Sequence, residues 1–164
     1  GSLPLRVGWV KITDLAMEML DVFASQARAN DVDLTMTNAS DLPALFVCDG
    51  QKVSWALATL VGNAIRYAQG AALTSAPHVD VHVAWDLDEE ELVLRVSDNG
   101  PGMTSARASA LFEPDAKSGR TAGLALVMVR DVVVAHGGHV EVDSRIGHGT
   151  TITMRLPKIE PPLQ

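Results

Sequence analysis

The sequence has a single cysteine, fewer basic than acidic residues, and no long apolar run. Cys48 is the only cysteine among 164 residues, so the chain cannot form an internal disulfide. The net charge of -7, with no basic cluster, argues against nonspecific binding to nucleic acid. No apolar run approaches the roughly 20 residues that a membrane-spanning helix requires. These absences predict a cytoplasmic domain in a reducing compartment.

What is present is typical of one globular domain. Hydrophobic residues make up 47% of the chain and charged residues 20%, which separates it from disordered sequences. A length of 164 residues suits a single domain over 1–164 with a substantial core. We interpret residues 1–2 (Gly-Ser) as a cloning scar and expect residues 157–164 to form a frayed tail.

The spacing of apolar residues predicts the elements of this domain. Spacings of three and four residues predict helices, and alternation predicts strands. The predicted helices cover residues 11–30, 51–68 and 122–136, with a short one at 105–111. The predicted strands cover residues 33–37, 44–48, 79–87, 91–97, 139–144 and 150–156. Together they predict an α+β two-layer sandwich, in which a mixed, mostly antiparallel sheet carries about three main helices on one face.

A turn rich in glycine follows the strand predicted at 91–97. Residues 98–102 read Asp-Asn-Gly-Pro-Gly. A carboxylate at the end of a buried strand is costly unless some group donates to it. The exocyclic amine of adenine is a suitable donor. The alternative is an Asp that only caps an ordinary turn, and Asp98 alone does not separate the two interpretations.

Polar side chains share one face of the helix predicted at 51–68. Thr59, Asn63 and Tyr67 are four residues apart, with Arg66 beside them. The amide oxygen of Asn63 is a hard ligand that suits Mg²⁺. Arg66 can neutralise phosphates, and the ring of Tyr67 can lie against a purine. The alternative is a solvated helix face with Tyr67 partly in the core.

The longest apolar helix begins beside a glycine. Gly123 lies at the start of the helix predicted at 122–136, where backbone N–H groups and the helix dipole can hold phosphate. Lys117 and Arg120 lie in the preceding loop and could fold onto that phosphate. The same pattern also describes a buried helix with a small residue at its start and solvated cations before it.

Five motifs, in order, resemble those of sensor histidine kinases. Residues 60–67 (LVGNAIRY) resemble the N box, 98–103 (DNGPGM) the G1 box and 111–114 (LFEP) the F box. Residues 123–126 (GLAL) are similar to the G2 region, and 147–151 (GHGTT) to the glycine-rich segment before the last strand. The chain thus resembles the catalytic and ATP-binding domain of these kinases. That resemblance implies the Bergerat fold, shared with gyrase, the Hsp90 chaperone and mismatch-repair ATPases.

The resemblance also implies a nucleotide site with ATP and Mg²⁺ as its cofactors. Asn63 would bind the metal, Arg66 the phosphates, and Asp98 the adenine amine. Residues 103–122 would form the ATP lid, with Phe112 as its anchor. The glycines of the G1 box would shape the pocket and hinge the lid, and the threonine of the closing segment would help the adenine contact through water. The other residues implied in nucleotide binding are Tyr67, Gly100, Gly102, Met103, Lys117, Gly123, Leu124 and Thr150.

Three departures from the family pattern bear on activity. Thr59 lies four residues before Asn63, where histidine kinases usually have Asn and the ATPase relatives have Glu. Without a carboxylate there, the water-activating base of a self-contained ATPase is missing. Thr121 and Ala125 replace glycines of the G2 box, and Asp115 replaces an aromatic residue in a short lid. The alternative is therefore a degenerate module that binds nucleotide weakly or not at all and serves as a signalling scaffold.

Histidine kinases act on a histidine that lies outside this type of domain. The acceptor histidine normally lies on a helical hairpin domain, and none of the five histidines here has that surrounding. We therefore expect a phosphoacceptor histidine domain elsewhere in the same protein, a response regulator as the next partner, no nucleic acid, and a homodimeric full-length protein. The sequence leaves open whether that protein is anchored in a membrane.

Overall fold

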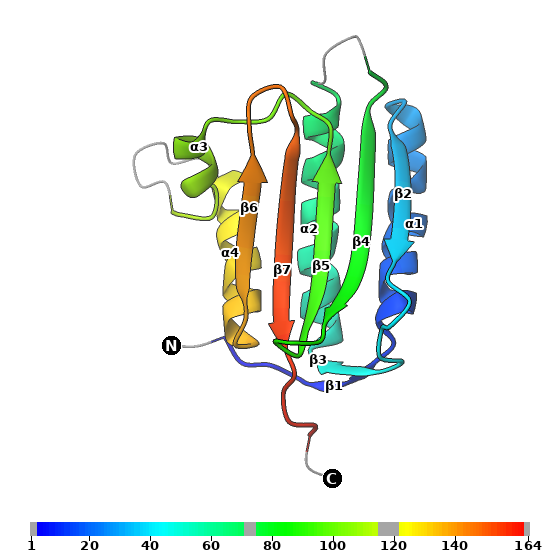
Figure 1. Ribbon diagram of the computed structural model, residues 1–164, viewed down its shortest axis with the longest axis vertical. Coiled ribbons are helices and arrows are strands. Elements are labelled where there is room, and N and C mark those ends of the chain that lie inside the picture. The colour runs from blue at the N-terminus through cyan, green and yellow to red at the C-terminus, as the bar shows by residue number, and fades with distance from the viewer. Residues whose placement is uncertain (1–2, 71–74, 115–121, 163–164) are drawn as a thin grey trace.

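The structure has two layers. The computed structural model describes residues 3–70, 75–114 and 122–162. The helices are α1 (Ile12–Ala29), α2 (Gly50–Ala68), α3 (Ser105–Ser109) and α4 (Ala122–Ala135). The strands are β1 (Gly8–Val10), β2 (Asp33–Asn38), β3 (Phe46–Cys48), β4 (His78–Asp86), β5 (Glu91–Asp98), β6 (His139–Ser144) and β7 (Thr150–Pro157). In Figure 1 the sheet lies in front of α1, α2 and α4, which confirms the predicted α+β two-layer sandwich.

The main sheet is mixed, as predicted. Its strand order is β2-β4-β5-β7-β6. The β4–β5 and β6–β7 hairpins are antiparallel, and β5 also pairs antiparallel with β7. β2 runs parallel to β4, so β3 and α2 lie in the crossover that a parallel neighbour requires. This order places the end of β5 and the start of β7 next to each other.

A small second sheet closes the lower end of the molecule in Figure 1. β1 and β3 pair antiparallel, with Val10 opposite Phe46. The strand predicted at 44–48 is therefore shorter than predicted and lies outside the main sheet. β1 has no signal in the sequence, because three residues are too few for alternation to be recognised.

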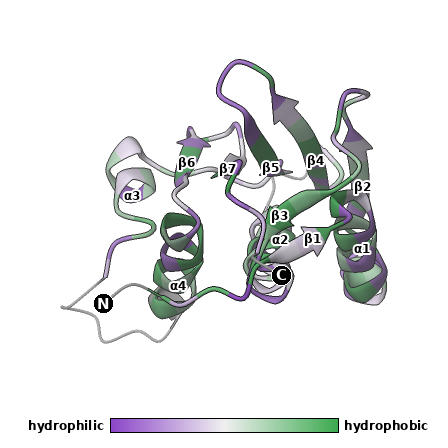
Figure 2. Cartoon of the chain, turned by 90° about the horizontal axis from the view of Figure 1, so that it is seen from below, coloured by the Kyte–Doolittle hydropathy of each residue, from purple (hydrophilic) through white to green (hydrophobic). Residues whose placement is uncertain are grey.

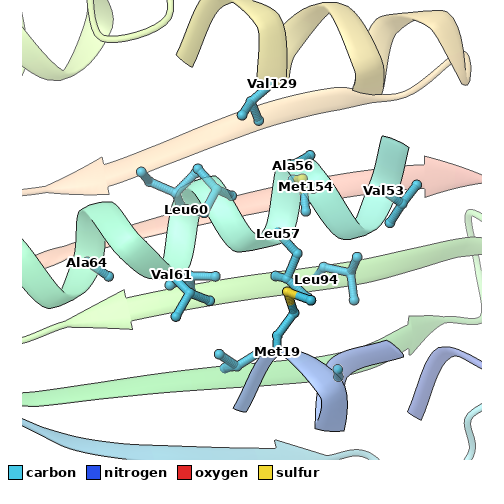
Figure 3. Packing of buried hydrophobic residues seen from close by; sticks show 14 of the residues in the cluster. Met19, Val53, Ala56, Leu57, Leu60, Val61, Ala64, Leu94, Val129 and Met154 are labelled. Atoms are coloured by element: carbon cyan, nitrogen blue, oxygen red, sulfur yellow. The ribbon is translucent and has the colours of Figure 1, made fainter. Parts of the chain in front are cut away.

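Helix α2 forms the centre of the helical layer. Its Leu57 and Leu60 side chains are at most 1% exposed. Figure 3 shows α2 between Met19 of α1 and Val129 of α4, with Met154 of the sheet beneath it. Truncating a leucine buried in this way typically costs about 2–5 kcal/mol. This packing fixes the rotation of α2, and therefore the direction in which its polar residues point.

A buried histidine joins α4 to the start of α2. The carboxylate of Asp49 caps α2 by accepting the backbone N–H of Lys52 at 3.1 Å. The N–H of Asp49 itself donates to Nε2 of His136 at 3.0 Å, and Nδ1 of His136 contacts the carbonyl oxygen of Val132 at 2.8 Å. Because Nε2 accepts a hydrogen bond, the ring proton lies on Nδ1. His136 is 3% exposed and is a structural residue.

The second face of the main sheet has no helix over it within the described residues, as Figure 2 shows. Hydroxyl and charged side chains cover that face. For example, Ser97 and Thr151 share a hydrogen bond across β5 and β7 at 3.0 Å. None of the helices in the described part of the chain combines the length and the apolar character needed to cross a membrane.

Candidate functional site

The predicted site residues gather at one end of the molecule. The C-terminal end of α2, the end of β5, the start of β7 and the start of α4 all lie in the upper half of Figure 1. Within the sheet, Asp98 lies directly opposite Thr150. The turn after β5 also contacts α2, because a Cβ atom on Gly100 would lie 2.3 Å from the carbonyl oxygen of Tyr67. Segments that are distant in the sequence therefore form one site.

Asp98 is a half-buried carboxylate held by backbone donors. The N–H of Gly100 donates to its Oδ1 at 2.9 Å, and the N–H of Thr150 also donates to the carboxylate. Burial nevertheless raises the pKa of Asp98 from 3.8 to about 6, since desolvation outweighs these two hydrogen bonds. At neutral pH the carboxylate is mostly ionised, and its remaining lone pairs can accept from a ligand donor.

The glycines of the turn are needed for contacts within the protein. Gly102 has φ +72°, and a Cβ atom there would lie 1.9 Å from the carbonyl oxygen of Arg145. A Cβ atom on Gly149 would lie 2.0 Å from the carbonyl oxygen of Asp98. The turn after β5 is thus packed backbone against backbone with the β6–β7 turn. These contacts alone account for the glycines that the motif contains.

Asn99 holds the site in place, a role that the motif by itself does not show. Its Oδ1 accepts the backbone N–H of His78 at 2.7 Å, and its Nδ2 donates to the carbonyl oxygen of Ala76 at 2.7 Å. The amide therefore ties the segment before β4 to the turn after β5. An Asn at the second position of a turn, followed by Gly, is a sequence signal for such a role.

The polar face of α2 is formed as the helical spacing predicts. Asn63 is 7% exposed, and its Oδ1 accepts a hydrogen bond from the guanidinium of Arg66, one turn further on. Tyr67 is half-buried, and burial raises the pKa of its hydroxyl, which also lies within the electrostatic influence of Arg107, Arg66 and Asp98. Tyr67 is therefore a neighbour of the strand-end carboxylate.

Thr59 lies on the same helix but is occupied within it. Its hydroxyl donates to the carbonyl oxygen of Trp55, four residues earlier, at 2.9 Å. A hydroxyl used in this way cannot replace the carboxylate that activates water in self-contained ATPases. In the part of the chain that the structure describes, no group of three or more His, Cys, Asp or Glu residues could hold a metal ion. A metal at this site would depend on Asn63 and on oxygens of the ligand.

The described part of the predicted lid comprises residues 103–114 and residue 122. Met103 is buried, and its backbone N–H donates to the Oγ of Ser144 at 3.0 Å. Phe112 is 6% exposed and belongs to the hydrophobic core, as expected of an anchor. The short helix α3 ends at Ser109, two residues earlier than predicted.

The first turn of α4 lies at the same end as Asp98. Gly123 and Leu124 belong to this turn, and the Leu124 side chain is 56% exposed. The first N–H groups of an α-helix have no partners within the helix, so they are available to an anion. Lys117 and Thr121, together with residues 115–116 and 118–120, lie outside the described residues.

A cavity of about 510 Å³ lies beside this site. Phe112 and α3 line it on the lid side, and Val140 and Val142 of β6 line it on the sheet side, with Arg130 of α4 among its polar neighbours. Neither Asn63 nor Asp98 lines it. The cavity therefore does not reach the predicted metal and adenine residues, although Ser144 and residues of the predicted lid line it.

Comparison with known proteins agrees with this geometry. The family described as "Histidine kinase-, DNA gyrase B-, and HSP90-like ATPase" matches residues 48–160. The chain is 28% identical over 153 residues to the adaptive-response sensory kinase SasA of Synechocystis sp., covering 89% of the chain and 38% of SasA. It is 26% identical over 160 residues to the alginate biosynthesis sensor protein KinB of Pseudomonas aeruginosa, covering 96% of the chain and 26% of KinB. The chain thus spans well under half the length of these relatives.

Solved structures share the fold. Full-length ShkA in complex with AMPPNP matches with a TM-score of 0.83 at 23% identity, over 99% of this chain and 34% of ShkA. The nucleotide-free catalytic domain of the histidine kinase ThkA matches with a TM-score of 0.77 at 20% identity, over 94% of this chain and 97% of that domain. The predicted Bergerat fold is thereby confirmed. With its site residues and most of its length inside the family match, the chain belongs to the family of histidine kinase-, DNA gyrase B- and HSP90-like ATPases.

Proposed function

We propose that the chain is the catalytic ATP-binding domain of a two-component sensor histidine kinase. It binds Mg-ATP and donates the γ-phosphate to a histidine on a separate domain. The observation that carries the proposal is the half-buried carboxylate of Asp98 opposite Thr150, beside the polar end of α2. The similarity to sensor kinases over most of the chain supports it.

Adenine recognition rests on the ionised Asp98. Its carboxylate already accepts two backbone N–H groups and keeps lone pairs for a further donor. The 6-amino group of adenine supplies that donor, and it compensates part of the cost of keeping the charge half-buried. The half-buried ring of Tyr67 offers an apolar surface for the nucleotide.

The phosphates lie, in this proposal, between α2 and the first turn of α4. Asn63 would supply one amide oxygen for Mg²⁺, which suits a metal that takes most of its other ligands from phosphate and water. The bound Mg²⁺ would neutralise charge on the β- and γ-phosphates. Arg66 must then leave the Asn63 oxygen, and its guanidinium is free to pair with phosphate instead. The N-terminus of α4 adds unpaired N–H groups.

Phosphoryl transfer by this domain is mainly positioning and charge neutralisation. An imidazole nitrogen of the acceptor domain forms a bond to the γ-phosphorus. The bond from that phosphorus to the β,γ-bridging oxygen breaks, and ADP leaves with the electron pair. The base that takes the imidazole proton belongs to the acceptor domain in this scheme, since Thr59 is occupied by the Trp55 carbonyl.

A non-catalytic scaffold is the second candidate. It is favoured by the hydrogen bond from the Arg66 guanidinium to Oδ1 of Asn63, the oxygen that would bind the metal. If Arg66 keeps that place when nucleotide is present, metal binding fails. The domain would then act through its surface alone.

The partners follow from the proposed reaction. The acceptor is a histidine domain of the same protein, and a response regulator receives the phosphate next. The full-length protein is proposed to be a homodimer, with this domain in the cytoplasm, where ATP is available and the Cys48 thiol stays reduced.

Calorimetric titration of ATP and ADP, with and without Mg²⁺, tests the proposal. We expect binding that depends on magnesium and that weakens at least about tenfold in Asp98→Asn, because an amide N–H₂ would face the adenine amine. Asp88→Asn, in the exposed turn between β4 and β5, is the matched control and should bind as the unaltered chain does.

The outcomes separate the candidates. Unchanged affinity in Asp98→Asn would contradict the adenine assignment. No binding by the unaltered chain at millimolar nucleotide would favour the scaffold. For the transfer step, the full-length protein incubated with γ-labelled ATP should form an acid-labile phosphohistidine.

A further inference from the structure

The hydroxyl of Ser144, the last residue of β6, joins three segments of the site. It accepts the backbone N–H of Met103, the first residue of the predicted lid, at 3.0 Å. It donates to the carbonyl oxygen of Gly149 in the β6–β7 turn at 3.0 Å. It also lies 2.8 Å from the hydroxyl of Thr150, the first residue of β7. One side chain thus contacts the lid, the turn and the residue opposite Asp98.

The number of protons decides the direction of the third hydrogen bond. A serine hydroxyl has one proton and two lone pairs. The Gly149 carbonyl can only accept, so the Ser144 proton is used there. Both lone pairs of Ser144 then accept, one from the Met103 N–H and the other from the Thr150 hydroxyl. The Ser144 hydroxyl therefore has no free hydrogen-bonding capacity, and the hydroxyl proton of Thr150 points toward it.

This direction determines what Thr150 can offer to a ligand. Thr150 is 3% exposed, and its only hydroxyl proton is used by Ser144. Its remaining lone pairs can only accept, directly or through one water. The ionised carboxylate of Asp98, opposite Thr150 in the sheet, can also only accept. Two acceptors side by side favour a 6-amino purine, which has two N–H donors, and disfavour a 6-oxo purine.

We propose that Ser144 is a positioning residue that sets the preference of the site for 6-amino over 6-oxo purine nucleotides. It acts by holding the proton of Thr150 away from the ligand and by fixing the start of the lid at Met103. The inference rests on the proposed nucleotide site and extends it to a residue that does not touch the nucleotide.

Competition between ATP and inosine triphosphate measures this preference. The two nucleotides differ at purine position 6 and in the proton on N1. In Ser144→Ala the Thr150 hydroxyl is free to turn and donate to a 6-oxo group. We expect the ratio of ATP affinity to inosine triphosphate affinity to fall about tenfold. Ser144→Thr keeps a hydroxyl at this position and should keep the ratio of the unaltered chain.

Ser97→Ala is the matched control. Ser97 makes a similar hydroxyl contact with Thr151, but across β5 and β7 and on the outer face of the sheet. Its removal should leave the ratio unchanged. If Ser144→Ala does not fold, Ser144→Cys replaces it, because a thiol is of similar size and a weak hydrogen-bond partner. Thermal unfolding of each variant shows whether it is folded.

Four results would overturn the inference. If Ser144→Ala weakens both nucleotides equally, the residue is only structural. If Ser97→Ala lowers the ratio as much, the effect does not come from Thr150. If the unaltered chain binds neither nucleotide, the proposed function fails together with the inference. If Ser144→Ala binds ATP normally and the affinity ratio is unchanged, the inference fails but the proposed function stands.

Discussion

Replacing Asp98 by asparagine should stabilise the fold at neutral pH, although the same change should weaken nucleotide binding. Burial raises the pKa of Asp98 from 3.8 to about 6, despite hydrogen bonds from the Gly100 and Thr150 N–H groups. The folded chain therefore holds a proton, between pH 3.8 and about 6, that the unfolded chain has already lost. Stability contributed by this group falls as the pH rises through that window and is lowest above it.

The magnitude follows from the pKa difference. Each unit of pKa corresponds to about 1.4 kcal/mol, so a rise from 3.8 to about 6 amounts to about 3 kcal/mol at full strength. Asp98 is only half-buried, and solvent screens its charge, so we expect about 1–2 kcal/mol. Asparagine resembles the neutral acid in shape and stays uncharged at every pH. The free energy of unfolding of Asp98→Asn should therefore exceed that of the unaltered chain by this amount at about pH 8, and the difference should disappear below about pH 4.

Urea unfolding followed by tryptophan fluorescence measures this difference. The midpoints of both chains are compared at several pH values from about 4 to 8, without nucleotide, and converted to free energies of unfolding. Other carboxylates titrate equally in both chains, so the difference between them isolates Asp98. The three tryptophans of the chain supply the signal.

Asp49→Asn is a control of opposite sign. Asp49 is buried, which alone would raise its pKa, but hydrogen bonds from Arg6 and Lys52 outweigh burial and lower it. Its ionised form therefore stabilises the fold at neutral pH, and that contribution is lost as the pH falls below 3.8. Asp49→Asn should thus be destabilised at neutral pH. If Asp98→Asn is instead less stable than the unaltered chain by the same amount at every pH, the reasoning on Asp98 is wrong.

Three further predictions concern the fold. Gly102→Ala should lower the free energy of unfolding by about 2–4 kcal/mol, because residue 102 has φ +72° and a Cβ atom there would lie 1.9 Å from a carbonyl oxygen. Gly147→Ala is the control: residue 147 has φ +83° but open space around it, so this change should cost only about 1 kcal/mol. Urea unfolding measures both. His136→Phe should cost about 1–3 kcal/mol, because it leaves a buried N–H at the start of α2 without an acceptor, while exposed His139→Phe should change stability little. Burial raises the pKa of the Cys48 thiol to about 12, so a thiol reagent at about pH 8 should label it only as fast as the chain unfolds, and faster labelling would mean local opening.

Much of the fold could be predicted from local spacing. The repeat of apolar residues along α2 predicts both its length and the shared face of Asn63 and Tyr67, because that face depends only on 3.6 residues per turn. The hairpins around the charged turn after β4 and the glycine turn after β6 also follow from local alternation. Phe112 is buried as the F-box motif predicts.

The tertiary structure alone decided the contacts between distant segments. Val10 and Phe46 pair in a two-stranded sheet, although only the strand that contains Phe46 has a signal in the sequence. The Arg66 guanidinium contacts Asn63, three residues earlier on the same helix; the contact is local, but the sequence does not show that it forms. A motif shows which residue types are present, but not which of their hydrogen-bonding groups are already used.

Ser144 illustrates the same division. The sequence places a serine before a glycine-rich turn. Nothing nearby in the sequence indicates that its hydroxyl accepts a hydrogen bond from Met103, which lies 41 residues earlier. Only the register of β6 against β7 brings that hydroxyl to Thr150, and the register of β7 against β5 places Thr150 opposite Asp98. Periodicity depends on the backbone of one segment, and it determined the helices and strands of this chain. The proton arrangement of the site depends on several strands packed together, so it was decided only when the sheet was complete.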